Sequence, residues 1–480
     1  IRTSQYALDL FTGPVFAGSR VTGLAGAYVA IAEDVDGDLQ NPASPAVRPF
    51  FSYTHFDYWL GFGLTFPATL ENTDFFNSGS KTHIANAPDS FVFLTPAVNV
   101  QLGELGIGVN VEFQNYALSQ SAGTGEGSSA ISATIPTVHL QVAHGFDRNQ
   151  WVFGAGVRLV SISIRDTLTQ RADFVSTGNG FEFGGVYKPE RHPLRLGLAV
   201  RTAIRTEASY RDDLLPDANG DLVVTNADGS SMYLPKAVAC PWDVNFGFAV
   251  QFGRRPFNPP WRTSAMRIER QTLEHRIREI DREAARKVAL REAKTAEERQ
   301  AIQKTYDGEQ KRDEAELDRD LAAARDRIEG ELTEMNRFYV QLSAALLVSG
   351  PVESAVGVES LVTQTVNRSG ERAVSSPRVG LESGGFLSFM RLRGGAYLEP
   401  TRFDGSSERL HGTFGVDIKL VRWNVFGAWP DDYLWRLGLG ADAARQYSTW
   451  GITLAGWYPR HTEPKEAPGN VGPTSAANFP

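Results

Sequence analysis

Apolar side chains alternate with small or charged ones along much of the chain. Between residues 104 and 113 one face carries Leu105, Ile107, Val109, Val111 and Phe113, and the other carries Gly, Asn and Glu. Residues 194–202 repeat this pattern. Successive side chains of a β-strand point to opposite faces, so a period of two predicts strands with one apolar face.

Fourteen segments share this pattern. They are residues 50–66, 90–102, 104–118, 132–146, 150–167, 178–188, 193–209, 237–253, 337–348, 374–387, 389–400, 409–426, 433–444 and 446–458. A soluble β-sandwich would show the same alternation. These segments, however, have the length of roughly 10 residues or more that crosses a bilayer at a tilt, and aromatic residues gather near their ends. No run of about 18 apolar residues occurs, so a membrane protein would have to be a closed barrel. We therefore predict an all-β transmembrane antiparallel barrel of about 14 strands.

The aromatic residues that we assign to the membrane interface form three groups along the chain. They are Tyr53, Phe56, Tyr58 and Trp59; Trp242, Trp423, Phe426, Trp429, Tyr433 and Trp435; and Tyr447, Trp450, Trp457 and Tyr458. The single cysteine, Cys240, excludes an intrachain disulfide. The first residues lack the features of a signal peptide, so we expect any such peptide to have been removed.

Connection lengths assign the two ends of the barrel. Short links near residues 102–104, 147–149, 189–192 and 429–432 alternate with longer links elsewhere. Because outer-membrane barrels have short periplasmic turns and long outer loops, both chain ends are predicted to be periplasmic. Residues 349–373 could hide a strand, but the strand count would then be odd, so we interpret them as an outer loop.

The strand at 150–167 changes its apolar face part-way. Trp151, Phe153 and Leu159 share one parity, whereas Val160 and Ile162 take the other. A β-bulge or kink near Leu159 and Val160 would explain the change. A simple register adjustment is the favoured interpretation, and a functional opening is the alternative.

Residues 263–337 are rich in Arg, Lys, Glu and Asp and contain no Pro, which is typical of solvated helices. Apolar residues recur at three- and four-residue steps, at Leu273, Ile277, Ile280, Ala284 and Val288 and at Leu317, Leu321, Ala324, Ile328 and Met335. We predict a coiled-coil hairpin. Thr295 and Glu298 fit a capping box that puts the turn near Lys294, with Asp307-Gly308 as the competing site. By the strand parity the hairpin projects into the periplasm, as a docking arm for an envelope protein or as a passive spacer.

Before the first strand lies a small-residue segment with Arg20, Gly23, Gly26, Ala27 and Tyr28, followed by Asn41, Pro42 and Ala43. This R-x-x-G-x-x-G-A-Y and N-P-A pattern resembles the hatch of the FadL-like outer-membrane transporters of hydrophobic compounds and their related adaptor barrels. The resemblance implies fourteen strands, a hatch inside the lumen, and an inward strand kink that opens a lateral exit. The predicted organisation is a hatch at 1–49, strands at 50–261, the hairpin at 262–336, strands at 337–458 and a flexible periplasmic tail at 459–480.

Charged residues on the small-residue faces would point into the lumen, because charge toward lipid is costly. These residues are Glu112, Arg158, Arg195, Arg201, Asp417, Lys419, Arg436 and Asp442. We expect them to pair with one another and with Arg20, Glu33 and Asp34. Such a scaffold would fix the plug; the alternative is an arginine site for the carboxylate of an amphipathic ligand.

Catalytic signatures are missing from the sequence: no H-E-x-x-H, C-x-x-C or G-x-S-x-G motif occurs. The acidic runs at 33–38 and 216–221 fit Asp-Gly and Asn-Gly turns better than calcium loops. We expect no enzyme activity, cofactor, metal or nucleic-acid partner. The predicted function is passive uptake of hydrophobic or amphipathic molecules such as fatty acids, by hatch displacement and lateral release into outer-membrane lipid. The alternative is a non-transporting anchor or adaptor of a secretion or motility machine.

Overall fold

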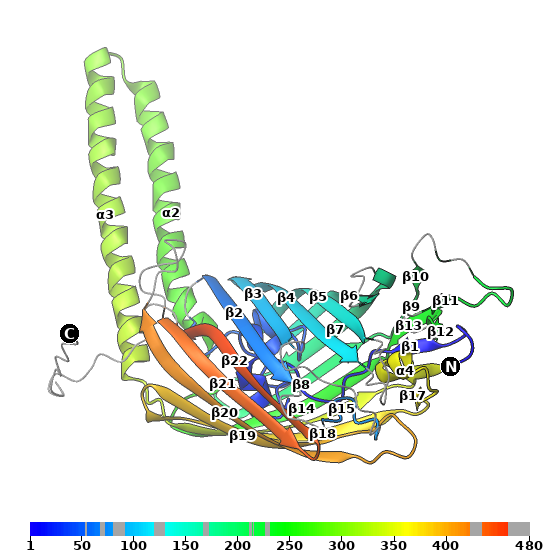
Figure 1. Cartoon of the computed structure of the whole chain (residues 1–480). Helices are drawn as coiled ribbons and strands as arrows, with labels where there is room; N and C mark the ends of the chain where they lie inside the picture. Colours follow the sequence, from blue (N-terminus) through cyan, green and yellow to red (C-terminus); the bar gives the residue numbers. More distant parts are fainter. Residues whose placement is uncertain are drawn as a thin grey trace, which may run out of the picture. The chain divides into compact units, whose positions relative to one another are not determined.

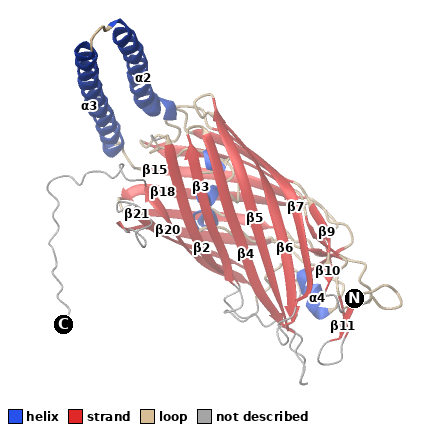
Figure 2. Ribbon diagram, turned by 90° about the horizontal axis from the view of Figure 1, so that it is seen from above, coloured by secondary structure: helices blue, strands red, loops and turns tan. Residues whose placement is uncertain are grey.

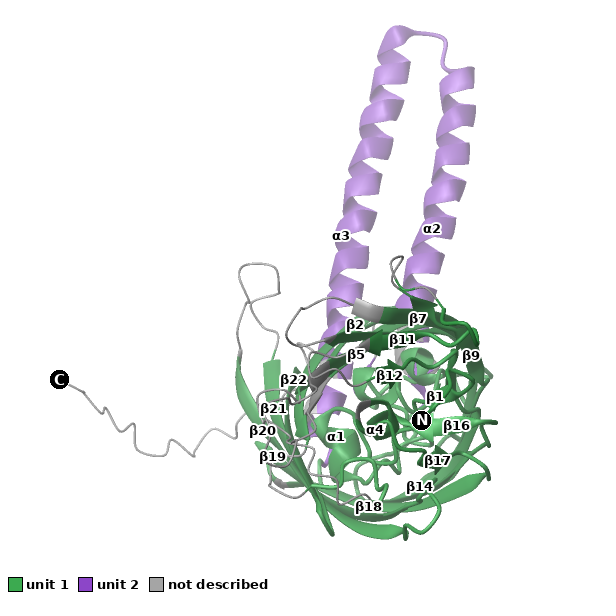
Figure 3. Cartoon of the chain, turned by 45° about the vertical axis from the view of Figure 1, so that its right-hand side comes forward, with its two compact units in different colours: residues 1–50, 55–259, 337–457 green, residues 51–54, 260–336, 458–480 purple. Residues whose placement is uncertain are grey.

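The computed structural model describes residues 1–52, 55–67, 73–79, 92–119, 130–166, 172–210, 214, 216–225, 231–422 and 434–458. The chain divides into two compact units (Figure 3). Residues 1–50, 55–259 and 337–457 form one unit, and residues 51–54, 260–336 and 458–480 form the other. Four of the predicted features lie outside the described residues: the interface aromatics Tyr53, Trp423, Phe426, Trp429 and Tyr433, the turn at 429–432, the end of the 409–426 strand and the tail at 459–480.

Long antiparallel strands build the first unit (Figures 1 and 2). They are β2 (Phe56–Pro67), β3 (Val92–Leu102), β4 (Leu105–Ser119), β5 (Ala130–Phe146), β6 (Trp151–Asp166), β7 (Ala172–Tyr187), β8 (Leu194–Arg201), β14 (Asp243–Gly253), β15 (Tyr339–Ser349), β18 (Val374–Leu387), β19 (Met390–Glu399), β20 (Arg409–Arg422), β21 (Leu434–Ala444) and β22 (Tyr447–Tyr458). β2 pairs with β22, and β7 pairs with β8, so the ladder of these fourteen described strands is closed. The predicted fold class is confirmed.

The outer face of the barrel is apolar. Phe181 and Phe183 on β7 are 53% and 52% exposed, and Leu196 and Leu198 on β8 are 46% and 49% exposed. A soluble monomer rarely exposes apolar patches of this extent, so the outer face is suited to lipid. Of the aromatics assigned to the interface, Phe56, Trp242 and Trp450 are exposed, but Trp59, Trp435, Tyr447 and Trp457 are buried, so the assignment is wrong for these four. No helix in the described part of the chain is long and apolar enough to cross a membrane.

A second, five-stranded sheet has the order β17-β16-β1-β13-β9. Its strands are β1 (Ala7–Asp9), β9 (Ile204–Glu207), β13 (Ala237–Cys240), β16 (Ala355–Gly357) and β17 (Arg368–Ser369). β1 lies in the middle and is parallel to both neighbours, with Leu8 opposite Val238 and Val356. Residues 349–373 therefore supply β16, the short helix α4 (Val358–Thr363) and β17, but no strand of the barrel.

The remaining short elements belong to the hatch and the loops. They are α1 (Ser19–Gly23), the 3-10 turns η1 (Val35–Gly37) and η2 (Ser44–Ala46), and the strands β10 (Ser209–Tyr210), β11 (Val223–Thr225) and β12 (Ser231–Tyr233). β10 pairs with β7, and β11 pairs with β12. The predicted strand at 193–209 thus ends early, at Arg201, and the strand at 237–253 is split into β13 and β14.

The predicted bulge at Leu159 and Val160 is wrong. β6 keeps one register against β7 from Trp151 to Ile164, and the register shifts only between Ile164 and Arg165. Leu159 is 39% exposed on the outer face, whereas Val160 is 7% exposed on the inner face. The strand does not change face. Beyond Arg158 the inner face of β6 also carries apolar side chains. The apolar parity of the sequence therefore changes although the strand keeps the same two faces.

The second unit contains two long helices, α2 (Trp261–Glu292) and α3 (Ala296–Glu334) (Figure 1). Thr295 caps α3: its Oγ1 accepts a hydrogen bond from Glu298 N at 3.1 Å, and Thr295 N donates to Glu298 Oε2 at 3.1 Å. The turn therefore lies at residues 293–295, and Asp307-Gly308 lies within α3. Ile328 and Leu332 pack with Ile268 of α2, but most of the predicted α2 stripe is exposed.

Candidate functional site: the plugged lumen

The N-terminal segment fills the barrel lumen. Every residue from Ser19 to Phe50 except Asp34 is buried. Glycines on the inner face of the strands make room for this segment. A Cβ on Gly154 would lie 2.0 Å from Pro42 O, and a Cβ on Gly197 would lie 2.3 Å from Val29 O. The small-residue faces of the strands are therefore the surface that receives the hatch.

Two hatch glycines also permit close contact with the wall. A Cβ on Gly23 would lie 2.9 Å from Gly415 Cα on β20. Gly26 has a φ of +72°, and its Cβ would lie 2.4 Å from Arg378 Nη1. L-residues rarely adopt that backbone conformation, so Gly26 combines a turn requirement with a packing requirement.

Arg20 connects the hatch to the wall. Its Nε donates to Glu382 Oε2 on β18 at 2.9 Å, and its Nη1 lies 3.3 Å from Glu33 Oε2. The guanidinium also lies 5.2 Å from the centre of the Tyr28 ring, and Tyr28 donates its hydroxyl proton to Glu33 O at 3.1 Å. Glu33 in turn pairs with Arg195 of β8 at 2.9 Å. Two wall strands thus hold the hatch through Arg20 and Glu33.

A chain of alternating charges continues from Glu382 along the wall. Arg393 bridges Glu382 at 2.5 Å and Asp417 at 2.6 Å. Arg436 pairs with the same Asp417 at 2.7 Å and also with Asp36 of the hatch. The chain begins at Glu33 and ends at Asp36, so both of its ends are hatch carboxylates.

Burial and these arginines act in opposite directions on the hatch acids. Burial favours the neutral form of Glu33, but Arg195 and Arg20 outweigh it and hold the pKa below its ordinary value. For Asp34 the effect of burial is larger than that of Arg20, and it raises the pKa of the Asp34 carboxyl to about 6. Burial also raises the pKa of Asp38, which accepts a hydrogen bond from Asn99 at 2.9 Å.

The Asn41-Pro42-Ala43 turn docks on β6 and β7. Asn41 Nδ2 donates to Val29 O at 2.8 Å and to Gly185 O at 3.2 Å, and its Oδ1 accepts from Ala43 N at 3.0 Å. The side chain therefore joins two parts of the hatch to the wall. Pro42 packs in the space left by the wall glycines.

The predicted lumen charges fall into separate clusters. Arg195, Asp417 and Arg436 belong to the chain between Glu33 and Asp36. Glu112 and Arg201 are linked through His139 and Glu182, and Asp442 belongs to a third cluster. Glu112 lies 3.5 Å from His139 Nε2, and His139 Nδ1 lies 3.0 Å from Glu182 Oε2. Arg201 pairs with Asp243 at 3.0 Å and donates to Leu39 O of the hatch at 2.5 Å. Lys419 shares the inward parity of Asp417 but is only partly buried. Asp442 accepts a hydrogen bond from Tyr397 at 2.6 Å and lies 2.8 Å from His411.

Arg158 lies apart from these clusters. Its Nη2 donates to Thr202 O at 3.2 Å, and its Nε is buried without a hydrogen-bond partner among the described residues. Arg158 lines a cavity of about 150 Å³ between the hatch, the wall and the bend before β14. The lining combines apolar Phe11, Ile135 and Val160 with Thr137 and with two acids, Glu112 and Asp243.

Beyond this charged belt the lumen is apolar. Phe93, Ile135, Ile162, Ile164 and Phe174 of the wall are all buried. They pack with residues from β1, α4 and the loops: Tyr6, Leu8, Phe16, Ile204, Met232, Leu234, Val238, Val356, Val358 and Leu361. The wall is thus polar or glycine-rich at the hatch and apolar at the end near β1.

Several residues at the centre of the site were not predicted. Glu382 and Arg393 lie inside predicted strands and alternate with apolar neighbours, so the parity argument that selected Asp417 would also have found them. Their pairing with the hatch could not be read from parity, because it depends on which strands face Arg20. Among the described residues no group of His, Cys, Asp and Glu is arranged to hold a metal ion.

Comparison with known proteins adds little beyond the fold. No family model and no curated protein matches the sequence. The similar solved structures include the Pseudomonas putida toluene transporter TodX (10% identity, 93% of this chain and 98% of that chain, TM-score 0.49), a Pseudomonas aeruginosa FadL homologue (9%, 93% and 99%, 0.48) and the CymD monoaromatic hydrocarbon channel (10%, 93% and 97%, 0.47). The chain is a plugged β-barrel of the outer-membrane type. That statement rests on the closed ladder, the apolar outer face and the filled lumen.

Proposed function

We propose that the barrel is a passive route for hydrophobic or amphipathic small molecules across the outer membrane. The observation that carries this proposal is the change along the lumen from polar to apolar walls. Water-filled barrels have polar interiors. Here Ile162, Ile164 and Phe174 would offer an apolar surface to a solute once the packed loops and β1 move aside.

The cavity at Arg158 supplies a first site for an amphipathic molecule. Phe11, Ile135 and Val160 would contact its apolar part, and the unpartnered Arg158 Nε would bind a carboxylate. The cavity is small, so a ligand longer than a few carbon atoms requires movement of the hatch.

The bend between β8 and β9 is our candidate for lateral release. The β8 and β14 strands pair up to Arg201 and Asp243, and the same register continues in β9 and β13, where Ile204 opposes Cys240. β13, however, pairs with β1 instead of staying in the wall. On the side of β7 away from β6, Thr202 N–H donates to Phe181 O at 2.9 Å, and Phe181 N–H donates to Thr202 Oγ1 at 2.9 Å, where β8 has already ended at Arg201. This bend replaces Leu159 and Val160 as the site of the proposed exit.

A disulfide between hatch and wall tests whether the hatch must move. A Cβ on Gly440 lies 3.4 Å from the Cβ of Ser19, close to the Cβ separation of about 3.5–4.5 Å in disulfides. We would introduce Ser19→Cys and Gly440→Cys together with Cys240→Ser and measure uptake of a fatty acid and of toluene by cells that lack other uptake barrels. Oxidation should abolish uptake, and reduction should restore it. Each single cysteine variant serves as the control.

Uptake that is equal in the oxidised and reduced proteins would show that the hatch does not move. No uptake by the unmodified protein of any apolar solute would remove the transport proposal. The periplasmic position of both chain ends remains part of this proposal and rests on the connection lengths.

A second candidate function, docking of a partner protein through the hairpin, is favoured by the exposed apolar residues of α2. Leu273 and Ile280 are 59% and 61% exposed. Deletion of residues 263–336 should then leave uptake intact and remove the partner. The two functions are compatible, because one uses the lumen and the other uses the helices.

A further inference from the structure

One face of α2 carries an apolar stripe that the hairpin does not cover. The side chains on it are all more than half exposed: Met266 54%, Leu273 59%, Ile277 51%, Ile280 61% and Val288 54%. From Met266 to Ile280 the spacing runs in steps of seven, four and three residues, so these side chains form one line along the helix. A row of this length on a solvated helix marks an interaction surface.

The opposite face of α2 meets α3. His275 on this face is 8% exposed, and Arg282 pairs with Asp313 of α3. Leu317 and Leu321 of α3 are partly buried on the facing side. Between His275 and Arg282, α3 therefore faces polar residues of α2, whereas nearer the start of α2 it meets the apolar Ile268. Contacts within the hairpin cannot cover the apolar stripe of α2.

The stripe has the heptad arrangement of a coiled-coil seam. Arg270, Ile277 and Ala284 occupy the a positions, and Met266, Leu273 and Ile280 occupy the d positions. Charged residues at the a position set the register of such seams. Here Arg270 occupies the first a position, and Lys287 occupies the d position that follows Ile280. These two charged residues limit the apolar core to the turns between them.

We propose that this stripe pairs with α2 of a second copy of the chain, parallel and in register. This identifies the partner of the docking surface proposed above and rests on that proposal. Two copies in one membrane have the same orientation, so their hairpins leave the barrels on the same side and run in the same direction. Confinement to one membrane also raises the effective concentration of the two helices.

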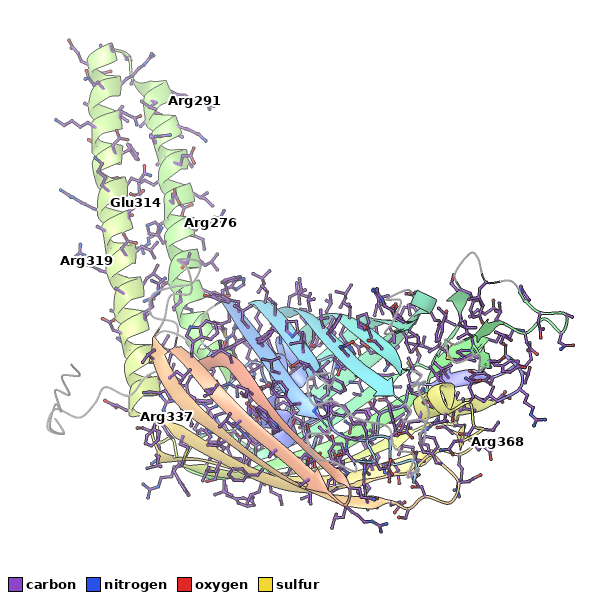
Figure 4. The ribbon with its side chains drawn as sticks, viewed as in Figure 1. Arg276, Arg291, Glu314, Arg319, Arg337 and Arg368 are labelled. Carbon is purple, nitrogen blue, oxygen red and sulfur yellow. The ribbon has the colours of Figure 1, made fainter. Side chains whose placement is uncertain are left out.

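The charges beside the seam favour this geometry. In a parallel pair, Arg276 at position g faces the partner's Asp281 at position e, and the symmetric contact forms as well. An antiparallel pair would oppose Glu274 and the partner's Asp281, which carry like charges. Among the described side chains of the hairpin, Arg276 and Asp281 make no ion pair, and Arg276 lies on the side of α2 away from α3 (Figure 4). Glu269 would face the partner's Glu274, so the pairing is centred on residues 276–281.

Position-specific disulfide formation in outer membranes tests the proposal, using the full chain with Cys240→Ser. Ile277→Cys and Ile280→Cys, one at a time, should give a covalent dimer of twice the chain mass under mild oxidation. Thr272→Cys, at an exposed position of the same helix but outside the stripe, is the matched control and should remain monomeric. Equal cross-linking at all three positions would indicate random collision and overturn the proposal.

A charge exchange tests the register. Arg276→Asp and Asp281→Arg should each lower the cross-linked fraction of the Ile277→Cys variant about fivefold, since each removes two interhelical pairs. The double exchange should restore it. A disulfide-linked product whose mass differs from that of a dimer of this chain would mean that a different protein occupies the stripe, which overturns the second-copy assignment but not docking. No product at either seam position would overturn the second-copy assignment. Uptake measured in the same cells tests the transport proposal separately.

Discussion

Glu382 should decide how firmly the hatch is held. This carboxylate is fully buried and accepts hydrogen bonds from Arg20 at 2.9 and 3.0 Å, from Arg393 at 2.5 Å and from Tyr339 at 2.6 Å. Glu382→Gln keeps the size of the side chain but removes the charge that joins the hatch arginine to the wall arginine. Arg20 and Arg393 would then face each other in the lumen without an anion between them.

Removing one partner of a buried ion pair costs about 3–5 kcal/mol, because a charge is left buried and uncompensated. Arg20 keeps Glu33 at 3.3 Å, and Arg393 keeps Asp417 at 2.6 Å. We therefore take the lower half of that range. At about 1.4 kcal/mol for each factor of ten, a loss of about 3–4 kcal/mol raises the open population of the hatch roughly 140- to 700-fold.

Hydrogen exchange of amides in residues 19–48, measured in detergent at pH 7, reports this population directly. Protection in the Glu382→Gln variant should fall by that factor while the heat-modifiable mobility of the folded barrel is retained. Glu399→Gln is the matched control, because Glu399 is equally buried and lies 2.7 Å from His411 of the wall instead of a hatch arginine. Exchange within threefold of wild type, or an equal loss in the control, would refute the view that the ion pairs hold the hatch.

Four further outcomes follow from the same contacts. Burial raises the pKa of Asp34 to about 6 from its ordinary 3.8, so protonated Asp34 stabilises the hatch fully below about pH 4, and this stabilisation is lost as the pH rises through 6. Amide exchange in the hatch should therefore accelerate between about pH 4 and pH 6, and Asp34→Asn should flatten this pH profile. Asn41→Ala leaves Val29 O and Ala43 N without their partner and should destabilise the hatch by about 1–3 kcal/mol in the same assay. Arg158→Gln should reduce fatty-acid uptake and spare toluene, and equal loss of both solutes would contradict a carboxylate site; Arg165→Gln, exposed on the same strand, is the control. Thr295→Ala should cost about 1 kcal/mol and speed amide exchange in the first turn of α3, with no change in the hatch.

Alternation of side chains was sufficient to locate the barrel. The segment from Glu104 to Phe113 was predicted as a strand because one face is apolar and the other is small or charged along its whole length. The same reasoning failed at Val160, where it assumed a uniformly polar lumen. Once the inner face itself becomes apolar, as at Ile162 and Ile164, parity no longer distinguishes lumen from lipid, and a regular strand looks kinked.

The hatch motif singled out Arg20 and Asn41 but could not predict their partners. Arg20 was predicted to form an ion pair with a carboxylate, but the sequence contains many candidate carboxylates. Its pairing with Glu382 depends on strands that are distant along the chain and meet only when the barrel closes. Likewise, the spacing of Leu273, Ile277 and Ile280 predicted an amphipathic helix. It could not say that α3 would meet the opposite face, because both faces of α2 can accept a neighbour.

The parallel insertion of β1 between β13 and β16 constrains how the protein can be assembled. β1 is among the first segments to be made, yet its two neighbours, at 237–239 and 355–357, follow much later in the chain. At the other end of the hatch, Arg48 donates to Gly103 O at 3.0 Å. The plug is therefore tethered at two points that do not exist together until most of the wall is built. The N-terminal segment can therefore reach its final position only after residues 237–239 and 355–357 have been made.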